Sequence, residues 1–150
     1  MKRLSIFFLF LIILTGLLAE RLDVEGVKER AEAGNDESQM VLAAMYDQGI
    51  GVEQSFEDAF YWASKSAVQS NTVAQVMVGQ MYFTGQGVKL NKVDGLAWVM
   101  LAFKSGSELA DIVGNELIKL MTEEEVEQSL TKLEELTAKL KKKVSEDEKI

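Results

Sequence analysis

The chain repeats a pattern of residues after 36 positions, with no insertion or deletion between the two copies. A period of roughly 20–50 residues is characteristic of folds built by stacking small supersecondary units. Such units bury a core between neighbours and usually present a binding surface rather than a reaction centre. The repeat therefore constrains the fold more than any other feature. The recurring residues are Tyr46, Gly49, Gly51, Val52, Asp58 and Trp62, which return as Tyr82, Gly85, Gly87, Val88, Asp94 and Trp98.

Each copy of the repeat has the pattern of two helices joined by a glycine turn. Between Glu37 and Gln48 the apolar and small residues follow helical spacing. Gly49 and Gly51 then end this helix, because glycine readily adopts the left-handed conformation that a tight exit requires. Ser55 is suited to cap the helix that follows. The second copy repeats this order, so the sequence predicts two consecutive helix pairs.

The recurring aromatic residues are interpreted as structural. Trp62 lies on a helical stripe with Ala59, Ala63 and Ala67, and small residues of this kind let two helices approach closely. We expect Trp62 and its counterpart Trp98 to fill the space that these small residues leave between units.

Residues on both sides of the two copies carry part of the same pattern. Residues 24–34 resemble the second helix of a preceding half unit, and residues 107–120 the first helix of a partial unit. Terminal units of a solenoid are expected to be atypical, because one of their faces meets water. The two complete units are predicted at residues 37–70 and 73–106.

A longer helix is predicted after the repeats. Thr122 and Glu125 have the spacing of a capping box. Lys139 and the three lysines from Lys141 favour the negative end of a helix. Residues 122–150 are therefore predicted to form a capping helix with a charged tail. The apolar stripe of this helix consists of Val126, Leu130, Leu133, Leu136 and Leu140.

Together these motifs resemble the Sel-1-like repeats, a tetratricopeptide-like class of helical solenoids. The resemblance rests on the Gly-X-Gly-Val turns at 49–52 and 85–88, each between a tyrosine-containing helix and a tryptophan-containing helix. It implies an all-α fold: a short right-handed solenoid of antiparallel helix pairs over residues 20–121, followed by the longer C-terminal helix. Ala43 stands where the family usually has glycine, and Gly95 where it usually has alanine. Inside a helix, Gly95 is expected to cost up to about 1 kcal/mol.

The first residues have the order of a secretory signal peptide. Two basic residues precede an uncharged run from Leu4 to Ala19, and Glu20 and Arg21 follow it. A helix over this run would be about 24 Å long, short of a bilayer core of about 30 Å. We therefore predict a signal peptide over residues 1–19 and a periplasmic or secreted protein. The alternative is an uncleaved N-terminal membrane anchor.

The chain is acidic, with a formal net charge of −8. Loss of residues 1–19 would remove two of the 16 basic residues and none of the 24 acidic ones, giving a charge near −10. Such a surface repels nucleic acid and anionic lipid, so neither is an expected partner. The membrane is expected to be touched only through an uncleaved N-terminal segment.

The chain has no histidine and no cysteine. These absences exclude histidine general bases, Ser-His-Asp and Cys-His nucleophiles, most zinc sites and a disulfide framework. We expect no cofactor, no metal site and no catalytic residues. The function predicted is that of an exported protein–protein interaction module: a scaffold, adaptor or inhibitor.

The resemblance also implies where a partner would bind, because the first helix of each tetratricopeptide-like unit lines the concave face. Met40, Val76 and Ile112 stand one period apart on these helices and are predicted to form an exposed apolar ladder. Such a ladder would suit a helix or an extended peptide with spaced apolar anchors. The predicted partner-binding groove consists of Met40, Ala44, Asp47, Val73, Val76, Gln80, Phe83, Leu109, Ile112 and Glu116.

Three alternatives remain open. The C-terminal helix could fold back and bury the ladder, because apolar stripes at helical spacing are usually core. Its stripe could instead pair two copies, making a weak homodimer of an otherwise monomeric protein. Finally, the protein could bind a cell-wall ligand or act as an enzyme through carboxylates of the groove. The carboxylates placed there are Glu37, Asp47 and Glu116.

Overall fold

The computed structural model describes residues 23–147, which fold into helices without a strand. The predicted signal peptide, residues 1–19, lies outside the described residues. Within residues 23–147 no helix is both long enough and apolar enough to span a bilayer. The helices are α2 (Val24–Glu32), α3 (Asp36–Gln48), α4 (Phe56–Ala67), α5 (Thr72–Thr84), α6 (Lys92–Lys104), α7 (Glu108–Ile118) and α8 (Glu123–Asp147).

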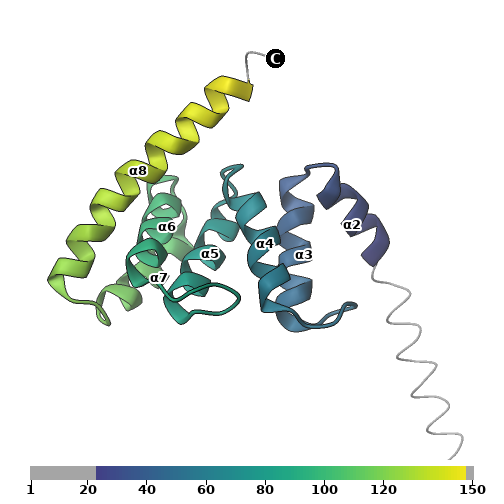
Figure 1. The fold of residues 1–150 in the computed structure, drawn as a ribbon, viewed down its shortest axis with the longest axis horizontal. Helices are drawn as coiled ribbons and strands as arrows, with labels where there is room; N and C mark the ends of the chain where they lie inside the picture. The colour runs from purple at the N-terminus through teal and green to yellow at the C-terminus, as the bar shows by residue number, and fades with distance from the viewer. Residues whose placement is uncertain (1–22, 148–150) are drawn as a thin grey trace, which may run out of the picture.

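The helices from α2 to α7 stand side by side along the long axis of the molecule (Figure 1). Within each repeat the two helices form a closely packed pair, α3 with α4 and α5 with α6. Each pair also packs on the helix before it, α3 on α2 and α5 on α4. The predicted all-α solenoid of helix pairs is therefore confirmed.

Equivalent backbone contacts set the turn of each unit. Gly49 and Gly85 end α3 and α5 in the left-handed conformation, with φ of 68° and 76°. The turn is then closed by the amide of the next capping residue: Ser55 N–H donates to Tyr46 O at 3.0 Å. In the second unit, Asn91 N–H makes the same bond to the Tyr82 carbonyl at 2.8 Å. Both units therefore leave their first helix in the same direction.

Buried glutamine amides join each unit to the one before it. The Gln39 amide donates to the Ala31 carbonyl at 3.0 Å, and the Gln75 amide donates to the Ala67 carbonyl at 3.0 Å. Both glutamines are buried. An unpaired amide N–H in such a place would cost free energy, so these bonds tie the first helix of each unit to the second helix before it.

One cluster of the core combines small residues with a buried tryptophan. Trp98 is buried in a cluster with Ala63, Ala67 and Val78, as predicted. Trp62 is half-buried: it packs against two core clusters, and Tyr61 and Lys65 cover part of the rest of its ring. The two tryptophans are therefore not equivalent in burial.

Gly95 has a packing role that differs from the expected weakening of its helix. A Cβ at this position would lie 2.7 Å from the Gly79 carbonyl oxygen of α5, and a Cβ at Gly79 would lie 2.7 Å from the Gly95 carbonyl oxygen. Side chains larger than hydrogen cannot enter this crossing. The two glycines therefore allow α5 and α6 to approach closely, which offsets the lower helix propensity of Gly95.

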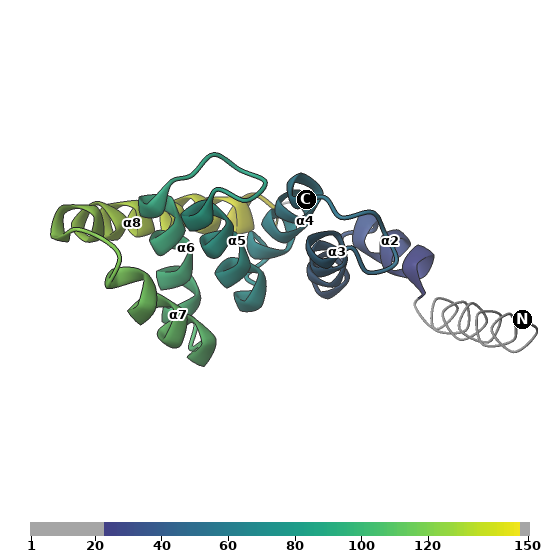
Figure 2. The same cartoon turned by 90° about the horizontal axis from the view of Figure 1, so that it is seen from below.

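Helix α8 does not pair with α7 in the way that α4 pairs with α3. It packs on α6, where Leu133 is buried beside Trp98 and Leu101. Lys132 of α8 also lies 3.5 Å from the Asp94 carboxylate of α6. Figure 2 shows α7 and α8 on opposite sides of the molecule. The C-terminal helix therefore packs across the second helices of the units.

The first prediction concerns two glycines with positive φ. A Cβ at Gly87 (φ 67°) would overlap the Phe56 carbonyl group, whereas a Cβ at Gly106 (φ 86°) would meet nothing within 4 Å. We expect Gly106→Ala to cost about 1–2 kcal/mol for its left-handed backbone. Gly87→Ala should cost about 1–3 kcal/mol more because of the overlap. Equal losses in urea denaturation would contradict this packing at Phe56.

The second prediction concerns a buried acceptor that only one unit satisfies. Gln69 donates to the Gln39 side-chain oxygen at 2.8 Å, but Ser105 occupies the equivalent position one period later. The Gln75 side-chain oxygen is left without a partner among the described residues. Ser105→Gln should therefore stabilise the protein by about 0.5–1.5 kcal/mol.

The matched reverse change is Gln69→Ser, which removes the existing bond and should cost a similar amount. Urea denaturation of both variants checks the pair. A loss in Gln69→Ser without a gain in Ser105→Gln would show that the two positions are not equivalent.

Candidate interaction groove

A surface hollow of about 400 Å³ lies between the first helices of the two complete units. We call it the α3–α5 groove. One residue of α7, Leu109, stands at its edge, and no residue of α8 lines it. The lining residues are Met40, Ala44, Asp47, Gln48, Val73, Val76, Met77, Gln80, Met81, Thr84, Gln86 and Leu109.

Matching caps place the two walls of the groove in register. The side chain of Asn35 accepts from the Ser38 amide at the start of α3, and that of Asn71 accepts from the Ala74 amide at the start of α5. Both helices have 13 residues and end at a left-handed glycine. The groove is consequently bounded by two helices of equal length that begin and end alike.

The groove is lined mainly by apolar side chains, together with a few polar ones such as Gln48 and Gln80. Three methionines, Met40, Met77 and Met81, contribute to the lining. Methionine is unbranched and polarisable, so such a surface adapts to ligands of different shape. Asp47 is the one charged residue of the lining, and no ion pair joins it to the described residues. The groove would therefore favour apolar anchors accompanied by a positive charge.

Seven of the ten predicted groove residues line this hollow. The remaining three lie elsewhere. Phe83 is half-buried and packs toward α6, with the Lys92 ammonium 5.5 Å from its ring centre. Ile112 is exposed on α7 beside a different hollow, and Glu116 pairs with Lys119 at 2.6 Å. The seven are Met40, Ala44, Asp47, Val73, Val76, Gln80 and Leu109.

The predicted exposed ladder is wrong. Val76 is 2% exposed, whereas Ile112, one period later, is 65% exposed. Val76 belongs to a buried cluster with Leu96 and Ala110, because α7 packs against α5 and α6 at this point. Ile112 stays exposed because no further first helix follows α7 among the described residues. The three ladder positions therefore differ in burial although their spacing is regular.

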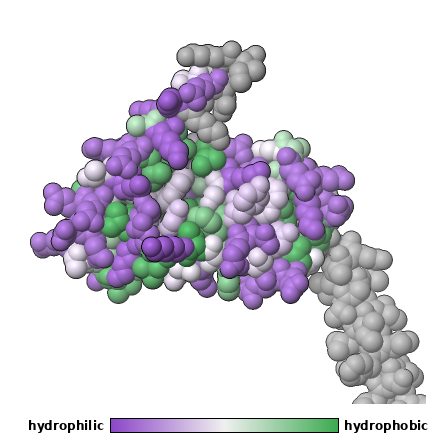
Figure 3. Space-filling view, in the orientation of Figure 1, coloured by the Kyte–Doolittle hydropathy of each residue, from purple (hydrophilic) through white to green (hydrophobic). Residues whose placement is uncertain are grey.

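Helix α8 leaves the groove open, contrary to the alternative in which it folds back. Its residues Leu133, Leu136 and Leu140 pack in the core cluster to which the second helices α4 and α6 contribute. In the view of Figure 3, the outer surface of α8 is mainly hydrophilic. The apolar stripe is thus used within the chain, and Leu130 is the member of the stripe that remains exposed, at 47%.

Several groove residues were missed by sequence reasoning. Met77 and Thr84 each follow a residue that was assigned to the concave face, so the predicted face was rotated by part of a turn. The helical spacing contains this signal, because Val73, Met77, Gln80 and Thr84 also form one stripe. Gln86 enters from the turn after α5, which no helical pattern could have indicated.

The recurring signature residues are structural. Tyr82 packs edge-on against Phe60 of the preceding unit, with ring centres 5.1 Å apart. Burial, and then the negative charge of Asp94, raise the pKa of the Tyr82 hydroxyl. The side chain therefore stays protonated in this contact between units. The glycines form the turns, and the tryptophans pack as described above.

The arrangement offers little to support carboxylate catalysis. Acid–base hydrolysis of the glycosidase type needs two carboxylates across one cleft. Asp47 lies in the groove, but Glu37 and Glu116 do not line it. Across the described part of the chain, no three residues among histidine, cysteine, aspartate and glutamate form a group that could hold a metal ion.

A family model described as Sel1 repeat matches the chain twice, at residues 36–71 and 72–107. This chain carries two Sel1 repeats. Both matches coincide with a complete helix pair, so the groove lies between the first helices of the two Sel1 units. Sel1 repeat proteins generally act as protein–protein interaction modules.

Solved structures show the same fold. A protective antigen present in uropathogenic Escherichia coli strains, which displays an SLR fold, matches with a TM-score of 0.74 and 28% identity. The match covers 78% of this chain and 25% of the antigen. A Sel1 repeat protein from Oxalobacter formigenes matches with a TM-score of 0.54 and 30% identity, over 57% of this chain and 35% of that protein. This chain thus spans about a third or less of both. No curated protein sequence was found to match it.

The third prediction separates the floor of the groove from its wall. Val76 is 2% exposed and Val73 is 49% exposed, although both are valines of α5. Val76→Glu should cost about 3 kcal/mol or more, because it buries a carboxylate without a partner. Val73→Glu should change stability by no more than about 0.5 kcal/mol. Guanidinium denaturation of both variants tests this, and a Val76→Glu variant as stable as wild type would refute the burial.

Proposed function

We propose that this protein is an interaction module that binds one peptide segment, helical or extended, in the α3–α5 groove. The observation that carries the proposal is an open apolar hollow between the first helices of two Sel1 units, with a single charged residue, Asp47, in its lining. Apolar pockets ringed by polar groups are typical places for peptide anchors.

The geometry favours a particular kind of peptide. Apolar side chains of the ligand would enter between Met40 and Met77, which can change shape to fit them. A lysine or arginine beside those anchors would pair with the Asp47 carboxylate. Gln48 and Gln80 would supply amide hydrogen bonds at the edge of the groove. Such a partner also suits the acidic chain as a whole, whose formal charge is −8.

We further propose that the module works outside the cytoplasm as a scaffold, adaptor or inhibitor. The support is the basic start, the uncharged run and the charged residues that follow it in the first 21 positions. Sequencing the N-terminus of protein recovered from its own cells tests this. Protein beginning at Glu20 would support export with cleavage, and protein beginning at Met1 would contradict cleavage.

The fourth prediction tests the groove with displayed random peptides. Peptides selected on wild-type protein should carry spaced apolar residues and a lysine or arginine. Val73→Glu replaces an apolar side chain of the groove with a charged one. It should therefore weaken the binding of these peptides at least about tenfold, which corresponds to a loss of about 1.4 kcal/mol.

The matched control is Val41→Glu. Val41 is 47% exposed on α3, almost as exposed as Val73, but it does not line the groove. Its variant should bind the selected peptides as wild type does in fluorescence titrations. Equal loss in both variants, or no enriched peptides, would contradict the proposed function.

A further inference from the structure

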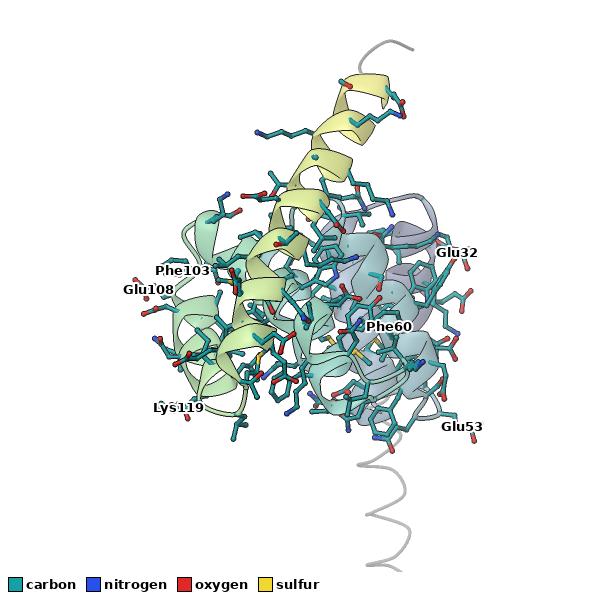
Figure 4. All side chains as sticks on the ribbon, turned by 60° about the vertical axis from the view of Figure 1, so that its left-hand side comes forward. Glu32, Glu53, Phe60, Phe103, Glu108 and Lys119 are labelled. Atoms are coloured by element: carbon teal, nitrogen blue, oxygen red, sulfur yellow. The ribbon has the colours of Figure 1, made fainter. Side chains whose placement is uncertain are left out.

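A second hollow, of about 280 Å³, lies between the C-terminal end of α6 and helix α8. We call it the α6–α8 hollow. In Figure 4, α8 crosses the face of the molecule, and its last turns extend beyond the other helices. The lining includes Ser70, Ser105 and Lys141, which are exposed, so the hollow opens to solvent on their side. Gln75 of α5 also lines it.

Gln75 brings a buried acceptor to this hollow. The residue is 1% exposed, and its amide nitrogen is used by the bond to the Ala67 carbonyl. Its side-chain oxygen has no hydrogen-bond partner among the described residues. A buried acceptor without a partner costs free energy, and such groups are normally satisfied. The oxygen is therefore suited to accept a hydrogen bond from a bound molecule.

The first unit shows which chemical group fits this position. There the Gln69 amide donates to the side-chain oxygen of Gln39, the counterpart of Gln75, at 2.8 Å. One period later Ser105 takes the place of Gln69. Its shorter side chain donates to the Leu101 carbonyl instead, at 3.2 Å. The second unit thus keeps the acceptor but lacks the carboxamide that satisfies it.

The other polar groups of the hollow fix the direction of a bound carboxamide. The hydroxyls of Thr137 and Ser105 already donate to backbone carbonyls, at 2.7 and 3.2 Å, so their oxygens remain as acceptors. Lys141 is the one charged residue of the lining, and no ion pair joins it to the described residues. A cationic ligand would be repelled by Lys141, and a carboxylate has no N–H to offer Gln75. A neutral carboxamide satisfies both.

We propose that the α6–α8 hollow binds a glutamine side chain of a protein partner, in the position that the Gln69 amide occupies in the first unit. The N–H groups of its carboxamide would donate to the Gln75 oxygen, and its carbonyl would accept from the Lys141 ammonium. Its methylene groups would lie against Leu101 and Leu140. A protein is the expected source, because Sel1 repeat proteins generally act through protein contacts.

This site is separate from the α3–α5 groove, because the two hollows share no lining residue. Binding at the α6–α8 hollow therefore does not depend on the proposed function of the groove. A partner that reached both surfaces would be held at two places at once.

Titration with a small probe tests the site. The protein obtained by expressing the full chain, labelled with ¹⁵N, is titrated with N-acetylglutamine N-methylamide and followed by NMR. A probe of about 14 non-hydrogen atoms should bind with a Kd of about 1 mM. The side-chain amide signals of Gln75 and the backbone amides of Ser105 and Leu140 should shift. N-acetylglutamate N-methylamide has the same shape but no side-chain N–H, so it should bind at least about fivefold more weakly.

Two substitutions at Ser105 form a matched pair. Ser105→Gln supplies the carboxamide from within the chain, so it should weaken binding of the glutamine probe at least about tenfold. Ser105→Ala leaves the hollow open and should bind the probe within about threefold of wild type. Far-ultraviolet circular dichroism confirms that both variants keep their helices, so loss of binding is not loss of the fold.

Three results would overturn the proposal. Wild-type protein whose signals do not shift at about 10 mM probe would show that the hollow binds no carboxamide and that water satisfies the Gln75 oxygen. Equal binding of the two probes would show that Gln75 does not select the amide. Equal binding by wild type and Ser105→Gln would place the probe at another surface, and shifts at Met77 and Met81 would identify that surface as the α3–α5 groove.

Discussion

Each unit of this protein is held on the preceding one by a buried glutamine amide that donates to a backbone carbonyl. Gln39 and Gln75 make this bond at the same distance, 3.0 Å. It fixes the stagger between units, and with it the separation of α3 and α5 that opens the groove. At the third occurrence Asp111 takes the place of glutamine, and a carboxylate has no N–H to donate. The glutamine–carbonyl bond between units is therefore not repeated at α7.

The loss of this bond at α7 coincides with two features of the fold. Helix α8 leaves α7 and packs on α6 instead, where Leu133 joins the buried core. It therefore stabilises the layer of second helices and leaves the first-helix layer open to a partner. The second feature is that α7 is the last first helix among the described residues, and its exposed side chains include Glu108, Ile112 and Lys119. The open first-helix layer is thus the surface suited to a peptide.

Local features of the fold were predictable from the sequence, because they depend on residues close together in the chain. The Gly49 and Gly85 turns, the capping residues and the helix pairs all follow from such patterns. The burial of Val76 did not, since it depends on where α7 packs. Helix propensity also missed a second role of Gly95, its close contact with Gly79, which lies 16 positions earlier in the sequence.

The direction of α8 could not be predicted for a related reason. A leucine stripe states which side of a helix is apolar, but not which of two apolar surfaces receives it. The choice depends on Ala97 and Trp98 of α6 presenting a surface that fits Leu133, and on Asp94 standing near Lys132. The candidate groove was predicted well where helix register was correct. It was wrong where a residue was assigned to the groove side of its helix but faces another helix, as Phe83 faces α6.

The most direct measurement is NMR of protein labelled at the methionine methyl groups, titrated with a selected peptide. Met40, Met77 and Met81 line the α3–α5 groove, whereas Met100 lines a hollow between α6 and α7 and Met121 packs beside α7. If the peptide binds in the groove, the first three methyl signals shift and those of Met100 and Met121 stay in place. Shifts confined to Met100 and Met121 would contradict the account and move the binding surface to α7.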